Sequence, residues 1–460
     1  MLSRLVLHND PSLSDHEVFH AAKVERSSTP YAFAERKYEA LPPMELWLQD
    51  KHTDRYGTLE EFLIKNKTTA FMVLQNDTII YENYFNGLYK DKPSIVFSVT
   101  KAVMTTLTSI AIDEGFIEGT DVLVSEFIPE YKDDPKRSKI TLNHLINMTS
   151  GLDWEDKVNV VKLAKAYYSK DVNDLVRSVK CKYEPGERFS YKSIDTQLLG
   201  ICLELAIGRP AFEYLQEKLW EPLGMEFDAY FTLDRKKGTA RMYGGLAACT
   251  RDLMKIGRLY LHQGNWNGKQ ILNTEWCKST SSRVCNTEKW WGYANGFWLE
   301  GYQCNNLFEA NDFYMAGFKG QVVYINPTKN LIIVRQGLSQ NKIKWELVCA
   351  RLANTLNNPT HKKINRADAQ LIGGKYENAK GDAVFLKKEE GRWEVSFNKQ
   401  KPWEFTEESP QSLLNSKKKK RIILEYNDDR SEIIGLYVDD FRNAVFYNKS
   451  DPALGALMQD

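Results

Sequence analysis

The pattern of hydrophobic positions along the chain contains one helical run that is apolar on most sides. It begins at Ser98 and reads Ser-Val-Thr-Lys-Ala-Val-Met-Thr-Thr-Leu-Thr-Ser-Ile-Ala-Ile-Asp-Glu-Gly. The apolar side chains that recur at helical spacing are Val99, Val103, Leu107 and Ile110. This spacing predicts a helix that ends at Gly115. Because so few of its sides are polar, we expect the helix to be buried, with its N-terminus facing a cleft.

Strand patterns lie on both sides of a long helical region. Two β-rich runs, 69–75 and 78–84, flank Asn76-Asp77, which is a hairpin signal. Further strands are expected at 296–300, 313–316, 321–326 and 331–335. Helices are expected at 141–148, 160–168, 171–179, 196–207, 211–219, 251–262 and about 342–356. Strands at both ends with helices between them predict one antiparallel sheet assembled from N-terminal and C-terminal parts.

The same patterns predict a domain organisation. Residues 1–55 are polar and interrupted by prolines, so they are expected to form an arm. Residues 56–356 form one α+β domain, with a helical subdomain at about 116–240. The polar stretch 357–367 is a linker to a small all-β domain, a barrel or a sandwich, at 368–460. The short alternating strands of that domain are expected at 383–387, 392–397, 421–426, 432–438 and 444–447.

Composition and charge exclude several classes of partner. The 460 residues are 42% hydrophobic with a formal net charge of +1, which argues against nucleic acid or an anionic membrane as the main partner. The basic run 417–421 is expected to be a solvated turn between two strands rather than a polyanion signal. No stretch is apolar for long enough to span a bilayer. The oligomeric state has no signature in the sequence.

Cysteine usage and the N-terminal residues bear on the compartment. The seven cysteines show no Cys-x-x-Cys pair and no metal-ligand spacing with histidine, so free thiols in a reducing compartment or simple core residues are expected. No metal or cofactor is implied. The first seven residues are too short for a signal peptide, which favours the cytoplasm, or the periplasm if a leader has been removed.

Ser98 and Lys101 carry the first candidate chemistry. Three residues apart in the first turn of a helix, the hydroxyl and the amine lie within reach of each other. Desolvation can lower a lysine pKa by about 3–5 units, which makes a neutral amine available as a base. The alternative is that Ser98 is only an N-cap and Lys101 a solvated residue. The other Ser-x-x-Lys runs, which lie in polar stretches, begin at Ser339, Ser396 and Ser416.

Two further segments would complete such a site. Tyr191 and Ser193 follow a Pro-Gly turn and precede a helix expected to begin near Asp195, so a phenol and a hydroxyl project from one loop as a proton relay. Ala316-Gly-Phe-Lys-Gly-Gln321 is a glycine-flanked turn between two strands. Gly320 lets the backbone approach a substrate, and the Gln321 amide can pair with that of Ser98 as an oxyanion hole. The alternative is an ordinary hairpin turn.

In this order the three pieces resemble the serine β-lactamase and penicillin-binding-protein superfamily, specifically its class C, esterase and 6-aminohexanoate-dimer hydrolase branch. Ser98-Val-Thr-Lys101 matches the nucleophile motif, and Tyr191-Lys-Ser193 matches the tyrosine motif of the nylon-oligomer hydrolases. Phe318-Lys-Gly320 stands at the place of the Lys-Thr-Gly or His-x-Gly element. The resemblance covers about residues 60–356. Supporting runs are Asn147–Leu152, Glu221–Met225 and Gly244–Asp252.

The resemblance implies a β-lactamase-like fold, an antiparallel sheet flanked by helices, and a serine hydrolase that forms an acyl-enzyme on an ester or amide of a small substrate. Two residues depart from the family's motifs and narrow the expected class of substrate. Ser193 stands where the lactamase forms usually carry Asn, so β-lactam hydrolysis is not favoured. Phe318 replaces a cationic or imidazole side chain, which removes the expected partner of a substrate carboxylate. Lys319, if extended, points the other way.

Other readings remain open. Asp153 and Trp154 follow the Ser-Gly-Leu run and are candidates for lining the cleft, although Trp154 is equally expected in the core. A penicillin-binding-type D-amino-acid peptidase and a non-catalytic ligand-binding relative are the alternative functions. A Ser-His-Asp site is not expected, because the chain has no Gly-x-Ser-x-Gly elbow.

Overall fold

A computed structural model describes the chain in two compact units, residues 1–299 with 310–357 and residues 300–309 with 358–460. The residues that it describes are 11–36, 41, 58–154, 156, 164, 166–281, 292–299, 312–356, 374–377, 383–389, 392–397, 403–409, 412–415, 420–426, 433–439 and 444–449. Of the predicted elements, the linker 357–367 and most of the helix at 160–168 lie outside these residues. Each unit is described by itself.

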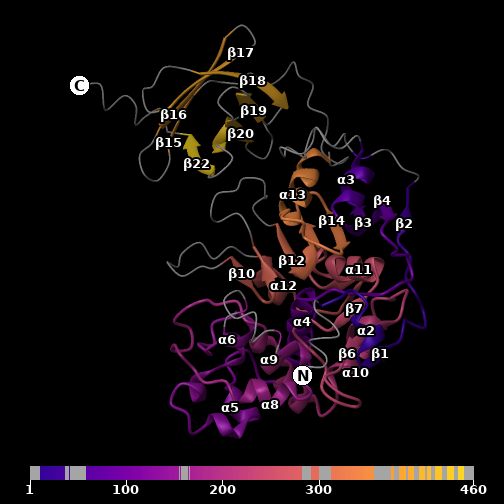
Figure 1. The fold of residues 1–460 in the computed structure, drawn as a ribbon. Helices are drawn as coiled ribbons and strands as arrows, with labels where there is room; N and C mark the ends of the chain where they lie inside the picture. The colour runs from indigo at the N-terminus through magenta and orange to yellow at the C-terminus, as the bar shows by residue number, and fades with distance from the viewer. Residues whose placement is uncertain are drawn as a thin grey trace. The chain divides into compact units, whose positions relative to one another are not determined.

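An eight-stranded sheet organises the first unit (Figure 1), in the order β10-β11-β12-β13-β14-β3-β4-β2. The pairing of β14 with β3 joins the C-terminal part of the sheet to the N-terminal part, as the sequence predicted. Among the described pairs of this sheet, β2 and β4 run parallel and the others antiparallel. The strands are β10 (Tyr293–Ala294), β11 (Phe297–Trp298), β12 (Phe313–Gly317), β13 (Gln321–Asn326), β14 (Leu331–Gly337), β3 (Thr68–Gln75), β4 (Thr78–Tyr84) and β2 (Ala34–Glu35).

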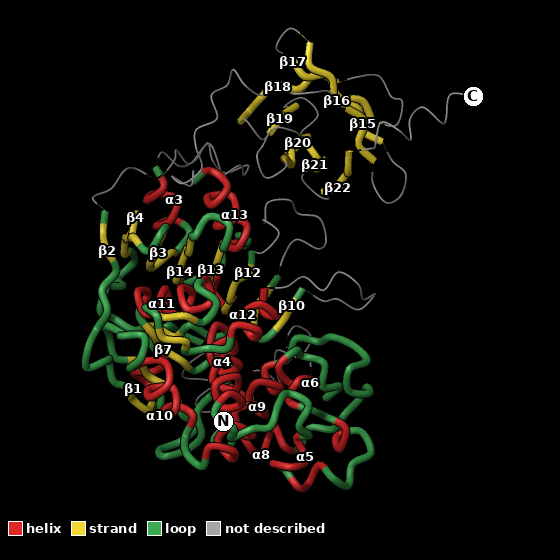
Figure 2. Tube along the Cα trace, turned by 180° about the vertical axis from the view of Figure 1, so that it is seen from behind, coloured by secondary structure: helices red, strands yellow, loops and turns green. Residues whose placement is uncertain are grey.

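Helices cover both faces of this sheet (Figure 2). On one face, Gly257 lets α11 (Thr250–Leu261) approach the side chains of Val323 and Ile332. On the other face, Trp345 of α13 (Trp345–Thr355) stacks on Arg335, and α3 (Leu59–Lys65) packs on β3. Since successive side chains alternate between the faces of a strand, two covered faces explain why β3 and β14 are buried along their whole length.

A four-stranded sheet and a helical region complete this unit. The sheet has the order β1-β6-β7-β5. Its strands are β1 (Ala21–Val24), β6 (Ala229–Thr232), β7 (Leu246–Ala248) and β5 (Ser94–Ile95). The helical region packs α9 against α4, the helix predicted from Ser98. Its helices are α4 (Val99–Asp113), α5 (Val124–Phe127), α6 (Leu142–Ile146), α8 (Val172–Arg177), α9 (Ser193–Ile207) and α10 (Ala211–Leu215), joined by short 3-10 and π turns.

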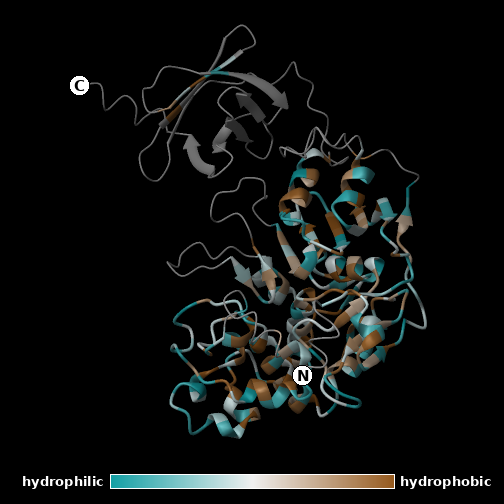
Figure 3. Cartoon of the chain, in the orientation of Figure 1, coloured by the Kyte–Doolittle hydropathy of each residue, from teal (hydrophilic) through white to brown (hydrophobic). Residues whose placement is uncertain are grey.

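This unit also contains several short elements. They are α2 (Asp15–Val18), β8 (Asn265–Trp266), β9 (Lys269–Gln270) and α12 (Thr274–Ser281). Figure 3 shows hydrophilic and hydrophobic residues side by side on its helices, as expected for helices that cover a core. Among the residues that the structure describes, no helix is both long and apolar enough to cross a membrane.

The N-terminal segment is more ordered than the predicted polar arm. β1 pairs antiparallel with β6, β2 pairs with β4, and several apolar side chains of the segment are buried. These buried side chains are Leu13, Phe19, Val24 and Phe33. The sequence pattern missed them because strands of four and two residues are too short to show alternation, and prolines interrupt the segment.

The second unit is a closed barrel in the order β15 to β22. The sequence predicted five of its strands, but β15, β18 and β19 were missed. Lys420 and Arg421 of the basic run belong to β20, whereas 417–419 lie outside the described residues. The strands are β15 (Gly374–Glu377), β16 (Ala383–Glu389), β17 (Arg392–Phe397), β18 (Trp403–Ser409), β19 (Ser412–Asn415), β20 (Lys420–Tyr426), β21 (Ile433–Asp439) and β22 (Ala444–Lys449).

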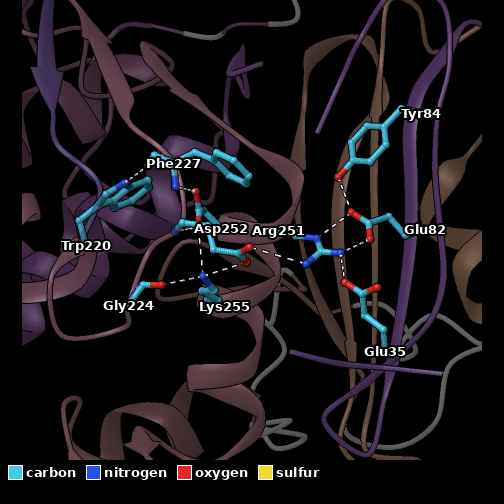
Figure 4. Close-up of polar contacts among 10 residues, drawn as sticks. Glu35, Glu82, Tyr84, Trp220, Gly224, Phe227, Arg251, Asp252 and Lys255 are labelled. Atoms are coloured by element: carbon cyan, nitrogen blue, oxygen red, sulfur yellow. Dashed lines mark hydrogen bonds and ion pairs between the residues drawn. The ribbon is translucent and has the colours of Figure 1, made fainter. Parts of the chain in front are cut away.

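Two buried cations of α11 form ion pairs with the N-terminal segment, with β4 and with a nearby loop (Figure 4). Arg251 contacts Glu35 of β2 and Glu82 of β4, with 2.8 Å from its Nε to Glu82 Oε1. Lys255, fully buried, donates to Gly224 O at 2.7 Å and lies 3.2 Å from Glu226. Its third neighbour, Asp252, lies 3.4 Å away and accepts the backbone amides of Glu226 and Phe227.

We expect Lys255→Met to lower the free energy of unfolding by about 3–5 kcal/mol, because it leaves the buried Asp252 carboxylate without its cation, whereas Glu226 keeps Arg251 at 3.6 Å. Equilibrium urea unfolding followed by circular dichroism measures this. Lys278→Met, which breaks an exposed pair with Glu275, is the matched control and should change stability by less than about 0.5 kcal/mol. Equal stability of the two variants would contradict the importance of the cluster.

Candidate active site

Ser98 lies at the N-terminus of α4, directly after β5. The preceding residue, Phe97, is buried and has a left-handed φ of 48°, a conformation that costs a non-glycine residue on the order of 1–3 kcal/mol. The Ser98 side chain makes no capping bond to the first turn, although the residue stands at the N-cap position. Its hydroxyl is therefore available for chemistry rather than used to cap the helix.

The Lys101 amine is buried beside this hydroxyl. Its side chain is 1% exposed, and its Nζ lies 2.9 Å from Ser98 Oγ. The amine also donates to the backbone oxygen of Tyr243 at 2.9 Å and lies 3.2 Å from Ser193 Oγ. Burial lowers the pKa of Lys101 to about 8, against an opposing effect of the nearby Asp156 carboxylate. A substantial neutral fraction is thus present at mildly alkaline pH.

Tyr191 approaches the pair from the loop before α9. Lys101 Nζ lies 5.0 Å from the centre of the Tyr191 ring, and the Ser98 side chain lowers the pKa of the phenol against the larger effect of burial. Burial raises the pKa of Tyr191 well above its ordinary value, so the phenol is protonated at neutral pH. Two aromatic side chains hold the ring in place, with centroid distances of 5.8 Å to Tyr293 and 5.2 Å to Trp298.

Ser193 is the first residue of α9, which begins two residues earlier than the sequence predicted. Its hydroxyl donates to Asp156 Oδ2 at 2.7 Å, and its amide lies 3.1 Å from both oxygens of that carboxylate. Sequence reasoning missed Asp156. The residue lies in an acidic run with Asp153 and Glu155, and no spacing distinguished it from either neighbour.

The turn between β12 and β13 lies against the strand-to-helix corner before Ser98. The phenyl rings of Phe318 and Phe97 are 5.4 Å apart, and Gly317 leaves so little room that a Cβ there would lie 2.4 Å from Val96 O. Gly320 has a φ of 79°, and a Cβ on it would meet Arg335 and Trp345. These two glycines therefore permit the close approach of the turn.

Arg335 of β14 fixes the carbonyl groups of this turn. Its Nη1 donates to Lys319 O at 2.8 Å and to Gly320 O at 2.7 Å. In a trans peptide the carbonyl and the following amide point in opposite directions, so the Gln321 N–H points away from Arg335. The Gln321 side chain is itself held by Phe318 O and Gly337 O, at 3.1 Å and 2.7 Å from its Nε2.

The remaining predicted site residues are placed as follows. Phe318 is 54% exposed next to the Ser98 corner, and Lys319 has a φ of 64° in the turn, so the expectation of an extended Lys319 was wrong. Asp153 is exposed, and its amide donates to Lys180 O. Trp154 is a 5% exposed core residue whose Nε1 donates to Asp156 Oδ1 at 2.9 Å.

Comparison with known proteins places this arrangement in a family. The family model described as Beta-lactamase matches residues 60–371, more than half of the chain and the whole region that carries the site. The chain belongs to the beta-lactamase family. Members of this family are serine hydrolases, and a buried serine–lysine pair at a helix N-terminus fits that chemistry.

Two curated relatives and one solved structure are similar to this beta-lactamase-family chain. The 6-aminohexanoate-dimer hydrolase of Paenarthrobacter ureafaciens is 26% identical over 329 residues, which cover 66% of this chain and 81% of the relative. An Escherichia coli K12 protein, provisionally named D-alanyl-D-alanine carboxypeptidase, is 21% identical over 363 residues, 64% of this chain and 81% of its own.

The solved structure is of a Bacillus anthracis protein provisionally named 6-aminohexanoate-dimer hydrolase. It is 23% identical with a TM-score of 0.61, over 74% of this chain and 90% of its own. This likeness confirms the predicted fold class, a β-lactamase-like combination of sheet and helices. Among the described residues, no group of three or more His, Cys, Asp or Glu side chains is arranged to hold a metal ion.

The lowered pKa of Lys101 predicts how the reactivity of Ser98 depends on pH. Because the neutral amine accepts the proton of Ser98, the rate of covalent labelling by a fluorophosphonate should rise about tenfold for each pH unit below 8 and level off above it. Intact-mass measurement of the Ser98 adduct over pH 5.5–9.5 gives this profile. Lys101→Ala should label far more slowly at every pH; a flat wild-type profile would contradict the lysine as the titrating group.

Proposed function

We propose that this beta-lactamase-family protein is an esterase or amidase that transfers the acyl group of a small substrate to Ser98 and then to water. The observation that carries the proposal is the 2.9 Å contact between Ser98 Oγ and the buried Lys101 amine. A nucleophile beside a desolvated base is what acyl transfer requires. Tyr191, whose ring centre lies 5.0 Å from Lys101 Nζ, is the third functional group.

In the first half-reaction, neutral Lys101 takes the Ser98 proton while Oγ bonds to the carbonyl carbon of the substrate. The protonated Tyr191 phenol then gives a proton to the leaving alkoxide or amine, and Lys101 returns a proton to the phenolate. The positions of Lys101 Nζ, 5.0 Å from the Tyr191 ring and 2.9 Å from Ser98 Oγ, support this order. In the second half-reaction, water attacks the carbonyl carbon of the acyl-enzyme. Lys101 and Tyr191 take a proton from this water and return one to Ser98 Oγ, and the acid is released.

The amides of Ser98 and Gln321 are proposed to stabilise the oxyanion. Among the described residues, the Ser98 amide donates to no backbone carbonyl, and the fixed Gly320 carbonyl turns the Gln321 amide away from Arg335. Loss of one such donor typically costs about a hundredfold to a thousandfold in rate. The amide of a helix N-terminus adds the favourable field of the helix dipole.

Charge near the serine favours a substrate without a free carboxylate. Phe318 presents an exposed apolar ring where the sequence motif leads one to expect a cation. Asp156 places a carboxylate 2.7 Å from Ser193 Oγ, which itself lies 3.2 Å from Lys101 Nζ. An anionic substrate would meet repulsion there without a compensating cation from Phe318. Uncharged esters and linear amides fit these surroundings better than peptides or lactams with a free carboxylate.

Two alternatives are tested by the same experiment. A D-amino-acid peptidase is favoured by the name of the Escherichia coli relative, although the apolar Phe318 offers no partner for a C-terminal carboxylate. A non-catalytic binding protein would retain the fold without turnover. That alternative is motivated by the exposed Phe318, which stands where the family's Lys-Thr-Gly or His-x-Gly element has a polar side chain.

A substrate panel separates these functions. We expect turnover of short-chain nitrophenyl esters and of linear amides without a free carboxylate, weak or no turnover of D-alanyl-D-alanine peptides and penicillin, and an acyl adduct on Ser98 by mass spectrometry. Ser98→Ala should lower turnover at least about a thousandfold. Ser339→Ala, from another Ser-x-x-Lys run, is the matched control with wild-type activity. Peptide turnover alone would favour the peptidase, and no adduct at all would contradict an enzyme.

Tyr191→Phe should lower kcat for a linear amide about a hundredfold to a ten-thousandfold, because the leaving amine loses its proton donor. A nitrophenyl ester, whose leaving group needs no proton, should lose less. Steady-state kinetics on the two substrates measures the difference, and circular dichroism confirms the fold. Tyr89→Phe, at a phenol that is 67% exposed, controls for loss of a hydroxyl elsewhere. Equal losses on both substrates would assign Tyr191 another role.

A further inference from the structure

The hydrogen bonds around the Lys101 amine determine where its lone pair points. A neutral amine has two N–H donors and one lone pair, and Lys101 Nζ has three partners within 3.2 Å. The backbone oxygen of Tyr243 can only accept, so one N–H is directed there. Of the two remaining partners, Ser98 Oγ and Ser193 Oγ, one accepts the second N–H and the other donates its proton to the lone pair. A hydroxyl can do either. Productive chemistry requires the lone pair to face Ser98.

Ser193 cannot offer its proton to Lys101, because another group takes it. The Ser193 hydroxyl has one proton, and its oxygen lies 2.7 Å from Asp156 Oδ2, to which it donates. Toward Lys101 the Ser193 oxygen therefore presents a lone pair and accepts the second N–H at 3.2 Å. With both N–H groups engaged, the lone pair of Lys101 is left for the Ser98 hydroxyl.

We propose that Asp156 is a positioning residue, which binds the Ser193 proton, makes the Ser193 oxygen an acceptor and so directs the Lys101 lone pair at Ser98. This inference rests on the proposed function of Ser98 and Lys101. When Oγ of Ser98 attacks, its proton moves to that lone pair, and the resulting ammonium keeps its bonds to Ser193 and Tyr243. Asp156 gives up no proton and touches no substrate atom.

The carboxylate is well suited to this task, because three contacts besides that of the Ser193 hydroxyl hold it in place. Trp154, a core residue, donates its indole N–H to Oδ1 at 2.9 Å, and the Ser193 amide lies 3.1 Å from both oxygens. The Asp156 amide donates to Tyr191 O at 3.4 Å. The residue therefore fixes both ends of the Tyr191–Ser193 loop, on which the proposed proton relay and the acceptor lie.

The charge of Asp156 also acts on Lys101, and few other ionisable groups compete with it. Among the described residues, the groups that face Lys101 Nζ are the Tyr191 ring at 5.0 Å and the Tyr243 ring at 5.9 Å. Burial raises the pKa of both phenols, so they stay neutral near pH 8. Asp156 raises the pKa of Lys101 and so opposes the effect of burial. Removal of this charge should therefore lower the pKa of the base.

The neighbouring ionisable groups on the same segment face elsewhere. Lys192 Nζ lies 3.3 Å from Leu152 O, and the Asp195 carboxylate accepts the Ser150 hydroxyl at 2.7 Å. Both side chains are buried behind the loop. They form a second lysine–serine–aspartate chain that does not contact Ser98 or Lys101 through any hydrogen bond described here.

The test compares Asp156→Asn, Ser193→Ala and the double variant in the rate of fluorophosphonate labelling of Ser98 across pH 5.5–9.5. An amide in place of the carboxylate can donate to Ser193 and free the Ser193 proton for Lys101. We expect the alkaline plateau to fall about tenfold to a hundredfold in each single variant. The acidic limb should move to lower pH in Asp156→Asn, and the double variant should label no more slowly than Ser193→Ala.

Asp133→Asn, which removes one exposed carboxylate with no described contact to the site, is the matched control and should label like wild type. If the wild type is labelled and Asp156→Asn has the same alkaline plateau and the same acidic limb in its pH–rate profile, this inference is overturned and the proposed function is not. So would losses that multiply in the double variant. Absence of wild-type labelling would instead overturn the proposed function. If Asp156→Asn does not fold, an unchanged plateau in Ser193→Ala overturns the inference.

Discussion

Exclusion of water from the Lys101 amine is the constraint on which the site depends. A solvated lysine is charged and cannot accept a proton, so the chemistry requires the first turn of α4 to be interior. The fold provides this by placing α4 between the large sheet and α9, with every residue from Val99 to Ala111 buried. Burial of a helix rich in threonine is tolerated because hydroxyls such as that of Thr106 donate to carbonyls of the preceding turn.

Rigid polar contacts surround the reactive groups. Phe97 holds a strained left-handed conformation directly before Ser98, and Arg335 holds the facing turn. The Arg335 guanidinium is fully buried, yet the acceptors that the structure describes for it are neutral oxygens of Thr68, Asn66, Lys319, Gly320 and Ser339. A guanidinium has five N–H donors in a fixed plane, which suits it to hold several carbonyl groups at once. The turn that carries the proposed oxyanion donor Gln321 is therefore held in place by Arg335 of β14.

The site joins parts of the chain that are far apart in sequence. Ser98 and Lys101 come from the first half of the hydrolase unit, Tyr191 and Ser193 from the helical region, and Gln321 from the returning strands. The pairing of β14 with β3 brings the last of these back beside the first. The Asp156 carboxylate and the apolar, exposed Phe318 ring determine the distribution of charge near the serine.

The sequence by itself determined the elements with clear periodicity and the motifs within them. The helix after Ser98, the hairpin strands β3 and β4, and strands β12, β13 and β14 follow from local patterns, because apolar periodicity reflects a face that must be buried. The order of the three motifs was enough to predict the fold. Short strands such as β1 and β2 carried too few residues for a pattern.

Only the tertiary structure decided which polar residues meet. Asp156 looks like its acidic neighbours Asp153 and Glu155 in the sequence, and the backbone oxygen of Tyr243 has no sequence signature at all. Their roles depend on distances across the fold, and a carboxylate acts on a lysine only where burial removes the water that would screen it. Local pattern fixes which face of a helix is apolar, whereas long-range packing fixes which proton acceptor lies beside which donor.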